Sequence, residues 1–260
     1  MREGSFKSIS LDLPTIYHKL FFMIILGIES STRMGSVAIL NIHSPNGISI
    51  ESTVLGQLIT DSRASHSEKL ILNIENILSQ NSIPREKIEM VAVSIGPGSF
   101  TGLRVGLSIA KGLSFALDIP LMPVGSLTAA AYPHLSKNNT PVVSFFDAKR
   151  GEVFAAAYDY SGLNWLPVQL IAPIIISFEE LLTEAEGIGA SFFVGDSEID
   201  HYKNTLIKKG YSIAAKGFNL PNAISVCSLA YLKQHSGIKP PNLNSLSPHY
   251  IRRFKPGKPL

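Results

Sequence analysis

The sequence contains very little cysteine, since Cys227 is the only one among 260 residues. A single cysteine excludes an internal disulfide and a cysteine-based zinc site, and it suits a reducing compartment. The seven histidines are scattered, and no two have the spacing of metal ligands on one helix or strand. No Gly-x-Ser-x-Gly elbow and no Walker-type Gly-Lys-Ser/Thr occur. The sequence therefore gives no support to a hydrolase, a cysteine-nucleophile enzyme or a histidine-based metalloenzyme.

Long apolar runs are also absent, because none reaches the roughly 20 residues that a membrane helix needs. The net charge of +3 is too small to argue for nucleic-acid binding by itself. Residues 1–22 show no clear period and no signal peptide, and Met23 directly precedes a strong strand pattern. We expect a cytoplasmic protein without membrane contact. We also expect residues 1–22 to be a disordered extension or an incorrectly assigned start.

The first half of the chain alternates between strand and helix patterns. Ser65 and Glu68 form the signature of a capping box at the start of one helix. The predicted elements are strands at 24–29, 35–42 and 48–55, a helix at about 66–80, a strand at 90–95 and a helix at 101–117. Their order is βββαβα.

The second half repeats this plan. Glu29 ends the first strand and precedes a Gly-x-Val hairpin, and Asp147 stands in the same relation to Gly151. This repetition indicates an ancient duplication. The fold class is therefore α/β, with two duplicated actin-like βββαβα domains (the ASKHA or Hsp70 type) that have mixed sheets. We predict an N-terminal domain at 23–122, a C-terminal domain with a basic tail at 123–260, and a hinge near 119–123.

The stretch Gly96–Gly106 joins a strand to a helix through a glycine-rich turn, which is the layout of a weak phosphate-binding loop. Gly102, Gly106 and Ala110 stand four residues apart and form one stripe of small side chains along the helix. The rest of this helix is apolar nearly all round, so it is buried on more than one side. Either its own domain covers both sides or a partner covers one of them.

Carboxylates at turns are the candidates for chemistry, namely Glu29, Asp147 and Asp196. In actin-like kinases such acids orient Mg²⁺ and the attacking hydroxyl. The turn after Glu29 lacks the Asp-x-Gly-x-Thr layout, so we assign no catalytic residue and favour acids that cap turns or pair with Lys149 and Arg150. The residues of this degenerate nucleotide cleft are Glu29, Ser30, Ser31, Thr32, Gly96, Gly98, Asp147 and Arg150.

Four segments together resemble the TsaB (YeaZ) family, and the Gly-Pro-Gly-Ser-Phe-Thr-Gly block is the most specific of them. The segments are Ile25–Thr32, Gly96–Gly106, Asp147–Val153 and Pro248–Arg252. The resemblance covers residues 23 to about 255. It implies a non-catalytic dimerisation subunit in the synthesis of N6-threonylcarbamoyladenosine at adenosine 37 of tRNAs that read ANN codons.

The resemblance also implies partners. They are a TsaD-like catalytic subunit, a TsaE-like ATPase, a second copy when the chain is alone, and tRNA only within the complex. No cofactor is expected to bind tightly, and ATP is used through the partner subunits. TsaD-like proteins have metal-binding histidines where this chain has Ser126 and Ala130, so no metal is expected.

In this family the dimer surface is built by the two helices predicted here at 66–80 and 101–117. Packed helix pairs would then place Gly102 and Gly106 at points of close contact. The expected contact residues are Leu70, Ile74, Ile77, Gly102, Leu103, Gly106, Leu107 and Ala110. Gly106→Leu or Leu103→Asp is expected to prevent partner binding and to leave the monomer folded.

Two other functions compete with this interpretation. A small-molecule kinase or ATPase of the same superfamily would bind ATP and Mg²⁺, and a metallopeptidase would need a bound metal. The tail at 236–260 is rich in proline and basic residues. It either contacts tRNA backbone or, as we favour, lies on the N-terminal domain as a solvated segment.

Overall fold

The structure is a computed structural model that describes residues 22–44, 50–61, 66–135, 140–160, 166–196 and 198–251. The predicted N-terminal extension, apart from Phe22, and the capping Ser65 lie outside these ranges. The first unit comprises β1 (Met23–Glu29), β2 (Met34–His43), β3 (Glu51–Asp61), α1 (His66–Gln80), β4 (Met90–Ser94), α2 (Phe100–Leu117) and β5 (Leu121–Val124). Its sheet has the order β3-β2-β1-β4-β5, with β1 to β3 antiparallel and β4 and β5 parallel to β1.

The second unit repeats this connectivity after α3 (Ser126–Leu135). It comprises β6 (Val142–Lys149), β7 (Glu152–Tyr160), β8 (Pro167–Ser177), α4 (Phe178–Gly187), β9 (Phe192–Gly195), α5 (Glu198–Lys208) and β10 (Ser212–Ile213). Its sheet order, β8-β7-β6-β9-β10, is the counterpart of the first. The predicted duplication of actin-like domains with mixed sheets is confirmed. Each unit has one more strand than predicted, β5 and β10, because short parallel strands carry little periodicity.

The central strand β1 is buried on both faces because helices cover both sides of its sheet. On one face, Leu26 and Ile28 pack with α1 and α2. On the other, Ile25 packs with α6 (Ala223–His235). A strand covered on both faces is apolar without alternation, which explains the run Met23–Ile28.

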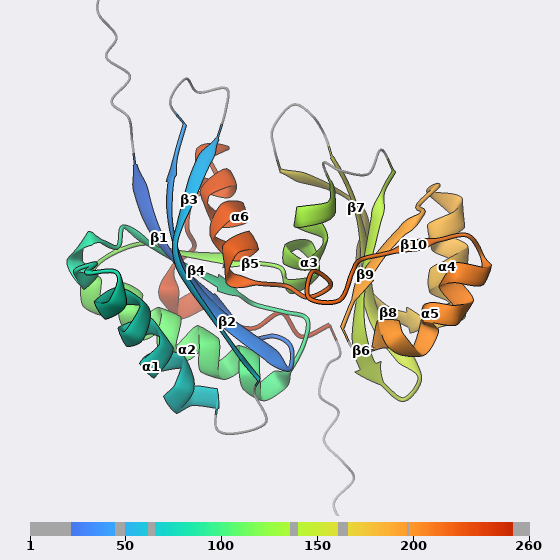
Figure 1. The fold of residues 1–260 in the computed structure, drawn as a ribbon, viewed down its shortest axis with the longest axis horizontal. Coiled ribbons are helices and arrows are strands. Elements are labelled where there is room, and N and C mark those ends of the chain that lie inside the picture. Colours follow the sequence, from blue (N-terminus) through green and yellow to red (C-terminus); the bar gives the residue numbers. More distant parts are fainter. Residues whose placement is uncertain are drawn as a thin grey trace, which may run out of the picture.

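Helices α3 and α6 lie between the two sheets (Figure 1). One side of α3 packs on the second sheet through Leu127 and Ala130, whereas Ala129 belongs to the cluster around α6. Helices α4 and α5 cover the outer face of the second sheet. Within the described residues, no helix has the length and the apolar character needed to cross a bilayer.

The division into domains at residue 122 needs correction. Strand β5 continues to Val124 and pairs with β4, so the predicted hinge at 119–123 lies partly inside the first sheet. Helix α6 also packs on the first sheet, although it follows the whole second unit in sequence. The first domain is therefore discontinuous, because the chain returns to it after residue 222.

Local signals were accurate where the sequence carried them. Ser177 caps α4 and forms a capping box with Glu180, as predicted. The third strand was placed too early, because β3 begins at Glu51 and runs to Asp61. Its outer positions are exposed, so an edge strand of this kind shows only a weak apolar pattern.

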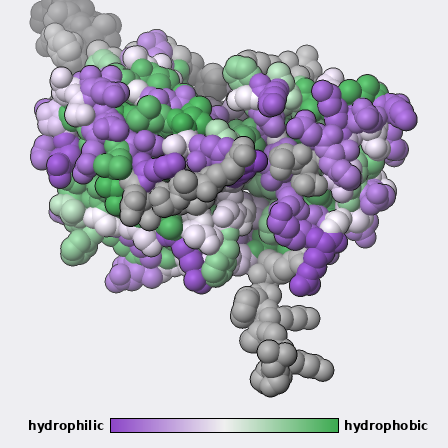
Figure 2. Space-filling view, turned by 60° about the horizontal axis from the view of Figure 1, so that its bottom comes forward, coloured by the Kyte–Doolittle hydropathy of each residue, from purple (hydrophilic) through white to green (hydrophobic). Residues whose placement is uncertain are grey.

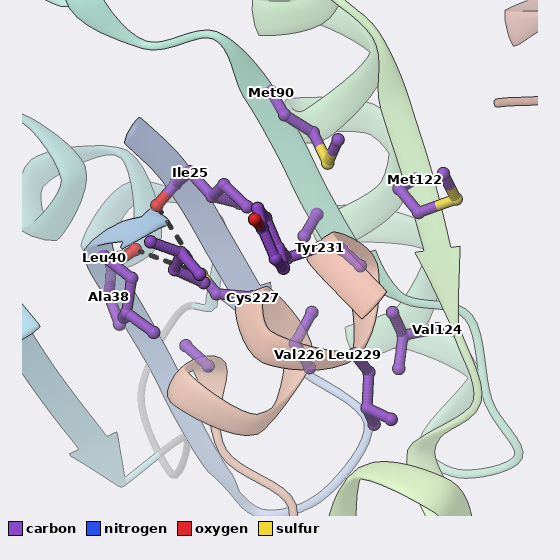
Figure 3. Close-up of a cluster of buried hydrophobic side chains, with 14 of the residues drawn as sticks. Ile25, Ala38, Leu40, Met90, Met122, Val124, Val226, Cys227, Leu229 and Tyr231 are labelled. Carbon is purple, nitrogen blue, oxygen red and sulfur yellow. Dashed lines mark hydrogen bonds between the residues drawn. The ribbon is translucent and has the colours of Figure 1, made fainter. Parts of the chain in front are cut away.

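Cys227 lies inside the cluster between α6 and the first sheet (Figure 3). Its thiol donates weakly to the carbonyl oxygen of Ile25, with the sulfur 3.5 Å away. A Cβ atom at Gly27 would stand 2.5 Å from this sulfur, so α6 approaches the backbone of β1 closely. Burial raises the pKa of the Cys227 thiol far above its usual range.

A thiol reagent such as DTNB is expected to react with Cys227 only at the rate at which the native chain unfolds. The reason is that the thiolate is the reactive species, and both access and ionisation are suppressed by burial. The measurement compares reaction rates in native buffer and in urea, where the unfolded chain is the fast control. A rapid reaction in native buffer would contradict the placement of α6.

Candidate functional site

The glycine-rich stretch packs directly against the turn that follows β1. An added Cβ at Gly98 would stand 2.2 Å from the carbonyl oxygen of Ser31, and one at Gly102 would stand 2.1 Å from that of Ser30. At Gly106 the same atom would meet the Ser30 hydroxyl at 2.1 Å. Glycine is required at Gly98 and Gly102 because the backbone of the turn occupies the space of a side chain, and at Gly106 the Ser30 hydroxyl fills that space.

Hydrogen bonds fix this contact. The Ser30 hydroxyl donates to the carbonyl of Gly102 at 2.9 Å, and the Ser99 amide donates to the carbonyl of Ser31 at 2.6 Å. The Ser99 side chain also caps α2 by accepting from the Gly102 amide. The chain's own groups therefore occupy the start of α2, where a phosphate-binding loop would present its amides to an anion.

Glu29 ends β1 behind this turn and is fully buried. Its Oε1 accepts hydrogen bonds from the amide and the hydroxyl of Ser31, whereas its Oε2 has no partner among the described residues. Burial raises the pKa of Glu29, and the hydrogen bonds from Ser31 and Ser94 oppose that rise only partly. A buried carboxyl of this kind favours its neutral form.

Asp147, the corresponding acid of the second unit, has different partners from those of Glu29. Asp147 accepts a hydrogen bond from the Lys149 amide at 2.7 Å and forms an ion pair with the Lys149 ammonium group. The carboxylate of Asp196 accepts from the Asp147 amide at 3.2 Å. Lys149 and Arg150 are exposed at the hairpin, and both have positive φ values. The expected pairing of Asp147 with Lys149 is confirmed.

The structure thus separates the predicted cleft residues into two groups. Glu29, Ser30, Ser31 and Thr32 are buried with the glycine loop inside the first domain, so the prediction that they line a nucleotide cleft needs correction. Asp147 and Arg150 belong to a hairpin of the second domain, where Asp147 bonds with Lys149 and Asp196 and not with the first group.

Gly96 and Ser126 connect the glycine loop to α3. The Ser126 amide donates to the carbonyl of Gly96 at 2.8 Å, and the Ser126 hydroxyl accepts from the Gly96 amide at 3.1 Å. Ser126 and Ala130 are both buried. Across the described part of the chain, no group of three or more His, Cys, Asp or Glu residues could hold a metal ion.

The expected contact residues on α1 and α2 also need correction. All eight are buried within the first domain, where the side chains of α1 and α2 cover one face of the first sheet. They are Leu70, Ile74, Ile77, Gly102, Leu103, Gly106, Leu107 and Ala110. Because the chain's own residues cover them, Gly106→Leu and Leu103→Asp are expected to disrupt the fold and not a partner contact alone.

The sides of α1 and α2 that face away from the first sheet carry exposed residues. Ile71 of α1 is 46% exposed and Phe115 of α2 is 80% exposed. Helix α2 also exposes Ser108, Gly112 and Ala116 to solvent. Figure 2, in which the lower part of Figure 1 comes forward, shows hydrophobic residues at the surface among hydrophilic ones. We call the exposed surface that comprises Ile71, Ser108, Gly112, Phe115 and Ala116 the outer face of α1 and α2.

The orientation of α1 follows from one hydrogen bond. The Asn73 side chain donates to the Thr60 hydroxyl of β3 at 2.7 Å, so that side of α1 faces β3. Residues two apart lie on opposite sides of a helix. Ile71 therefore lies on the side of α1 that faces away from β3. The apolar pattern of α1 contained Ile71, but it did not show which apolar residues the sheet would leave uncovered.

A C-terminal strap, residues 243–250, runs along the other side of α2. Leu246 inserts into the core beside Leu107, and its carbonyl accepts from the Lys111 ammonium group at 2.7 Å. The His249 amide donates to the carbonyl of Ile95 at 2.7 Å. This part of the tail lies on the N-terminal domain, as favoured from the sequence. Residues 252–260 lie outside the described ranges.

A hollow of about 370 Å³ lies where the strap begins, at the end of α2. Phe115, Ile119, Pro240, Pro241 and Leu243 are among the residues that line it. It is separate from the buried acid of β1, which does not line it.

Comparisons with known proteins agree with this geometry. A family model described as "TsaD: tRNA N6-adenosine threonylcarbamoyltransferase" matches residues 53–238. The TsaB protein of Haemophilus influenzae is 29% identical over 227 residues, which cover 82% of this chain and 88% of the relative. The TsaB protein of Bacillus subtilis is 33% identical over 140 residues, and the match spans about half of each protein, 53% and 56%.

Solved structures support the fold. The structure titled "YeaZ from Pseudomonas aeruginosa" superposes with a TM-score of 0.70 at 20% identity, and the match covers 88% of this chain and 99% of that one. The duplicated mixed sheets, with Glu29 at the end of β1 and Asp147 near the end of β6, define a protein of the actin-like two-domain class. The chain belongs to the tRNA N6-adenosine threonylcarbamoyltransferase family and, within it, to the TsaB (YeaZ) proteins.

Gly102→Ala is expected to lower the free energy of unfolding by about 1–3 kcal/mol, because the new methyl group would overlap the carbonyl of Ser30. Gly112→Ala on the same helix is the matched control. No heavy atom lies within 4 Å of its added Cβ, so a gain of up to about 1 kcal/mol from helix propensity is expected. Urea unfolding of both variants measures the change in the free energy of unfolding. Equal changes in the two variants would contradict the close packing of the turn against Gly102.

Glu29→Gln is expected to stabilise the protein increasingly as the pH rises above the pKa of the unfolded carboxyl. Because the folded pKa is raised, the folded state binds more protons than the unfolded state in this window. The contribution of Glu29 to the stability of the unmodified protein therefore falls with rising pH, and the neutral amide of the variant removes that fall. Urea unfolding of both proteins between acid and neutral pH gives the difference, and a difference that shrinks with rising pH would refute it.

Proposed function

We propose that this chain is a non-catalytic subunit that supports the formation of N6-threonylcarbamoyladenosine in tRNA. In this proposal it binds a TsaD-like catalytic subunit and, with it, a TsaE-like ATPase. It holds no tightly bound cofactor and meets tRNA only within the complex. The names of its relatives concern the synthesis of this nucleoside, which supports the reaction assigned here.

The observation that carries the docking role is the outer face of α1 and α2. Apolar side chains are exposed there, and Ser108, Gly112 and Ala116 leave room for a partner's backbone to approach α2. Small residues at a helix surface permit close packing of a second helix. The TsaD-like partner shares the family model of this chain, so a pair of equivalent helices is the occupant proposed here. A second copy of this chain would present the same helices when the partner is absent.

We assign no catalytic role because the two acids of the duplicated hairpins, Glu29 and Asp147, are already engaged by other groups of the chain. Glu29 is enclosed behind the turn after β1, and Asp147 is engaged with Lys149. A phosphoryl-transfer enzyme needs accessible groups that hold Mg²⁺ and position the attacking oxygen. The buried turn therefore disfavours the alternative function, a small-molecule kinase or ATPase. Calorimetry of the isolated chain with ATP and Mg²⁺ separates the two, since micromolar binding with turnover would support the alternative.

Ile71→Asp and Gly112→Arg are each expected to weaken binding of the TsaD-like subunit by about tenfold or more, because each places charge or bulk at the centre of the proposed contact. Co-elution in size-exclusion chromatography and a tRNA modification assay of the reconstituted complex are the measurements. Both positions are exposed, so the fold is expected to survive.

Ile207→Asp is the matched control for these variants. Ile207 is 54% exposed, similar to Ile71, but it lies on α5 of the second domain. It is expected to leave co-elution and modification unchanged. If Ile71→Asp and Gly112→Arg bind the TsaD-like subunit as tightly as Ile207→Asp does, the outer face is not the docking surface.

A further inference from the structure

An exposed stack of three side chains lies where the strap meets the start of α2. The ring of Phe100 faces the ring of Tyr250, with centroids 5.2 Å apart. The guanidinium carbon of Arg104 stands 3.8 Å from the centroid of Phe100, and its Nε donates to the Tyr250 hydroxyl at 2.9 Å. All three residues are exposed. We call this group the Phe100–Arg104–Tyr250 stack.

Arg104 is held in place by Phe100 and Tyr250 and has no anionic partner in the part of the chain that the structure describes. Arg33, by contrast, pairs with Asp61 at 3.1 Å. Among the described residues, no carboxylate forms an ion pair with Arg104, and its hydrogen bond to Tyr250 occupies only Nε. Its terminal N–H groups are therefore available in a fixed plane. A guanidinium ordered in this way matches the two oxygens of a phosphate.

The charge along the sequence is strongly uneven around this stack. Residues 201–260 contain no aspartate or glutamate, although the whole chain carries 20 of them. The lysines and arginines of this segment are Lys203, Lys208, Lys209, Lys216, Lys233, Lys239, Arg252, Arg253, Lys255 and Lys258. Helix α2 also lacks acidic residues. The strap and α2 thus carry no acidic side chain beside Arg104 and Lys111, which favours a polyanionic partner.

The aromatic rings indicate which polyanion fits. Exposed Phe, Tyr and Arg planes stack on unpaired bases, and adjacent cations contact the phosphates of the same strand. A duplex hides its bases and offers nothing for the rings to stack on. An acidic protein segment would use Arg104, but it would leave Phe100 and Tyr250 in water. Exposed rings, a guanidinium that forms no ion pair among the described residues and an acid-free segment together favour binding to a single strand.

We propose that the Phe100–Arg104–Tyr250 stack binds an unpaired segment of RNA, with a phosphate at the terminal N–H groups of Arg104 and a base against the aromatic rings. This rests on the proposed function, in which the substrate is a tRNA and its loops supply the unpaired bases. It goes further than that function, which places tRNA contact only within the complex, because the stack would give the isolated chain an affinity of its own for unpaired RNA. Arg104 precedes Ser108 and Gly112 by one and two turns on the same exposed stripe of α2, and Tyr250 of the strap accepts its hydrogen bond at the start of that stripe. The stack therefore borders the proposed docking contact at the start of α2, whereas Phe115 stands near the other end of the helix.

The full chain is titrated against a fluorescein-labelled single-stranded RNA of mixed sequence, with a duplex of equal length as the reference probe. The single strand is expected to bind more tightly, with an affinity that falls as salt rises. Arg104→Ala, Phe100→Ala and Tyr250→Ala are each expected to weaken single-strand binding by about five- to tenfold. Thermal unfolding of each variant shows whether it is folded.

Two control variants separate stacking from charge. Arg85→Ala removes one exposed positive charge elsewhere in the first domain and is expected to bind the single strand normally. Arg104→Lys keeps the charge but loses the planar fork, so it is expected to bind more weakly than the unmodified chain. If the unmodified chain does not prefer the single strand, or if Arg104→Ala binds like Arg85→Ala, the proposal is overturned.

The same variants are tested for co-elution with the TsaD-like subunit. Retained co-elution with lost RNA binding is the expected result. If Arg104→Ala loses the protein partner and binds RNA normally, the stack is a protein contact and the proposal is wrong. RNA binding is measured on the isolated chain, so a failure to bind RNA would leave the docking proposal intact. Conversely, Ile71→Asp is expected to lose co-elution with the TsaD-like subunit and to keep RNA binding.

Discussion

The contact between the turn after β1 and the start of α2 is the constraint on which the rest of the structure depends. The backbone of Ser30 and Ser31 leaves no room for a Cβ atom at Gly98 and Gly102, and the Ser30 hydroxyl fills that space at Gly106. The contact sets the position of α2 on the sheet. Through the paired hydrogen bonds between Gly96 and Ser126, it also positions the start of α3. A sequence block that has the layout of a phosphate loop therefore serves internal packing.

This packing has a consequence for chemistry. It encloses Glu29, raises the pKa of its carboxyl and leaves one oxygen without a partner among the described residues. In the second domain Asp147 is neutralised by Lys149. Glu29 and Asp147, the two acids that mark the duplicated architecture, thus bond to residues of their own hairpins. A fold that supports phosphoryl transfer elsewhere is compatible here with a subunit that acts by binding.

The same packing leaves the outer side of α2 free between two neighbours. Helix α1 borders it on one side, and the strap that begins at Leu243 borders it on the other. Ser108, Gly112 and Ala116 lie along the exposed stripe of α2 and suit a partner helix. The start of the same stripe carries the Phe100–Arg104–Tyr250 stack, next to an acid-free part of the sequence. The two surfaces differ in chemistry, and the proposed protein and RNA partners differ accordingly.

The sequence by itself determined the order of the elements, the duplication, the cap at Ser177 and the family, because these depend on local periodicity and on short motifs. Only the tertiary structure decided what covers each apolar side. An apolar stripe such as Leu103 and Leu107 shows that a side is buried, but burial against the chain's own sheet and burial against a partner give the same pattern. The return of α6 to the first sheet and the meeting of Tyr250 with Arg104 join residues far apart in sequence, and no local signal specifies such contacts.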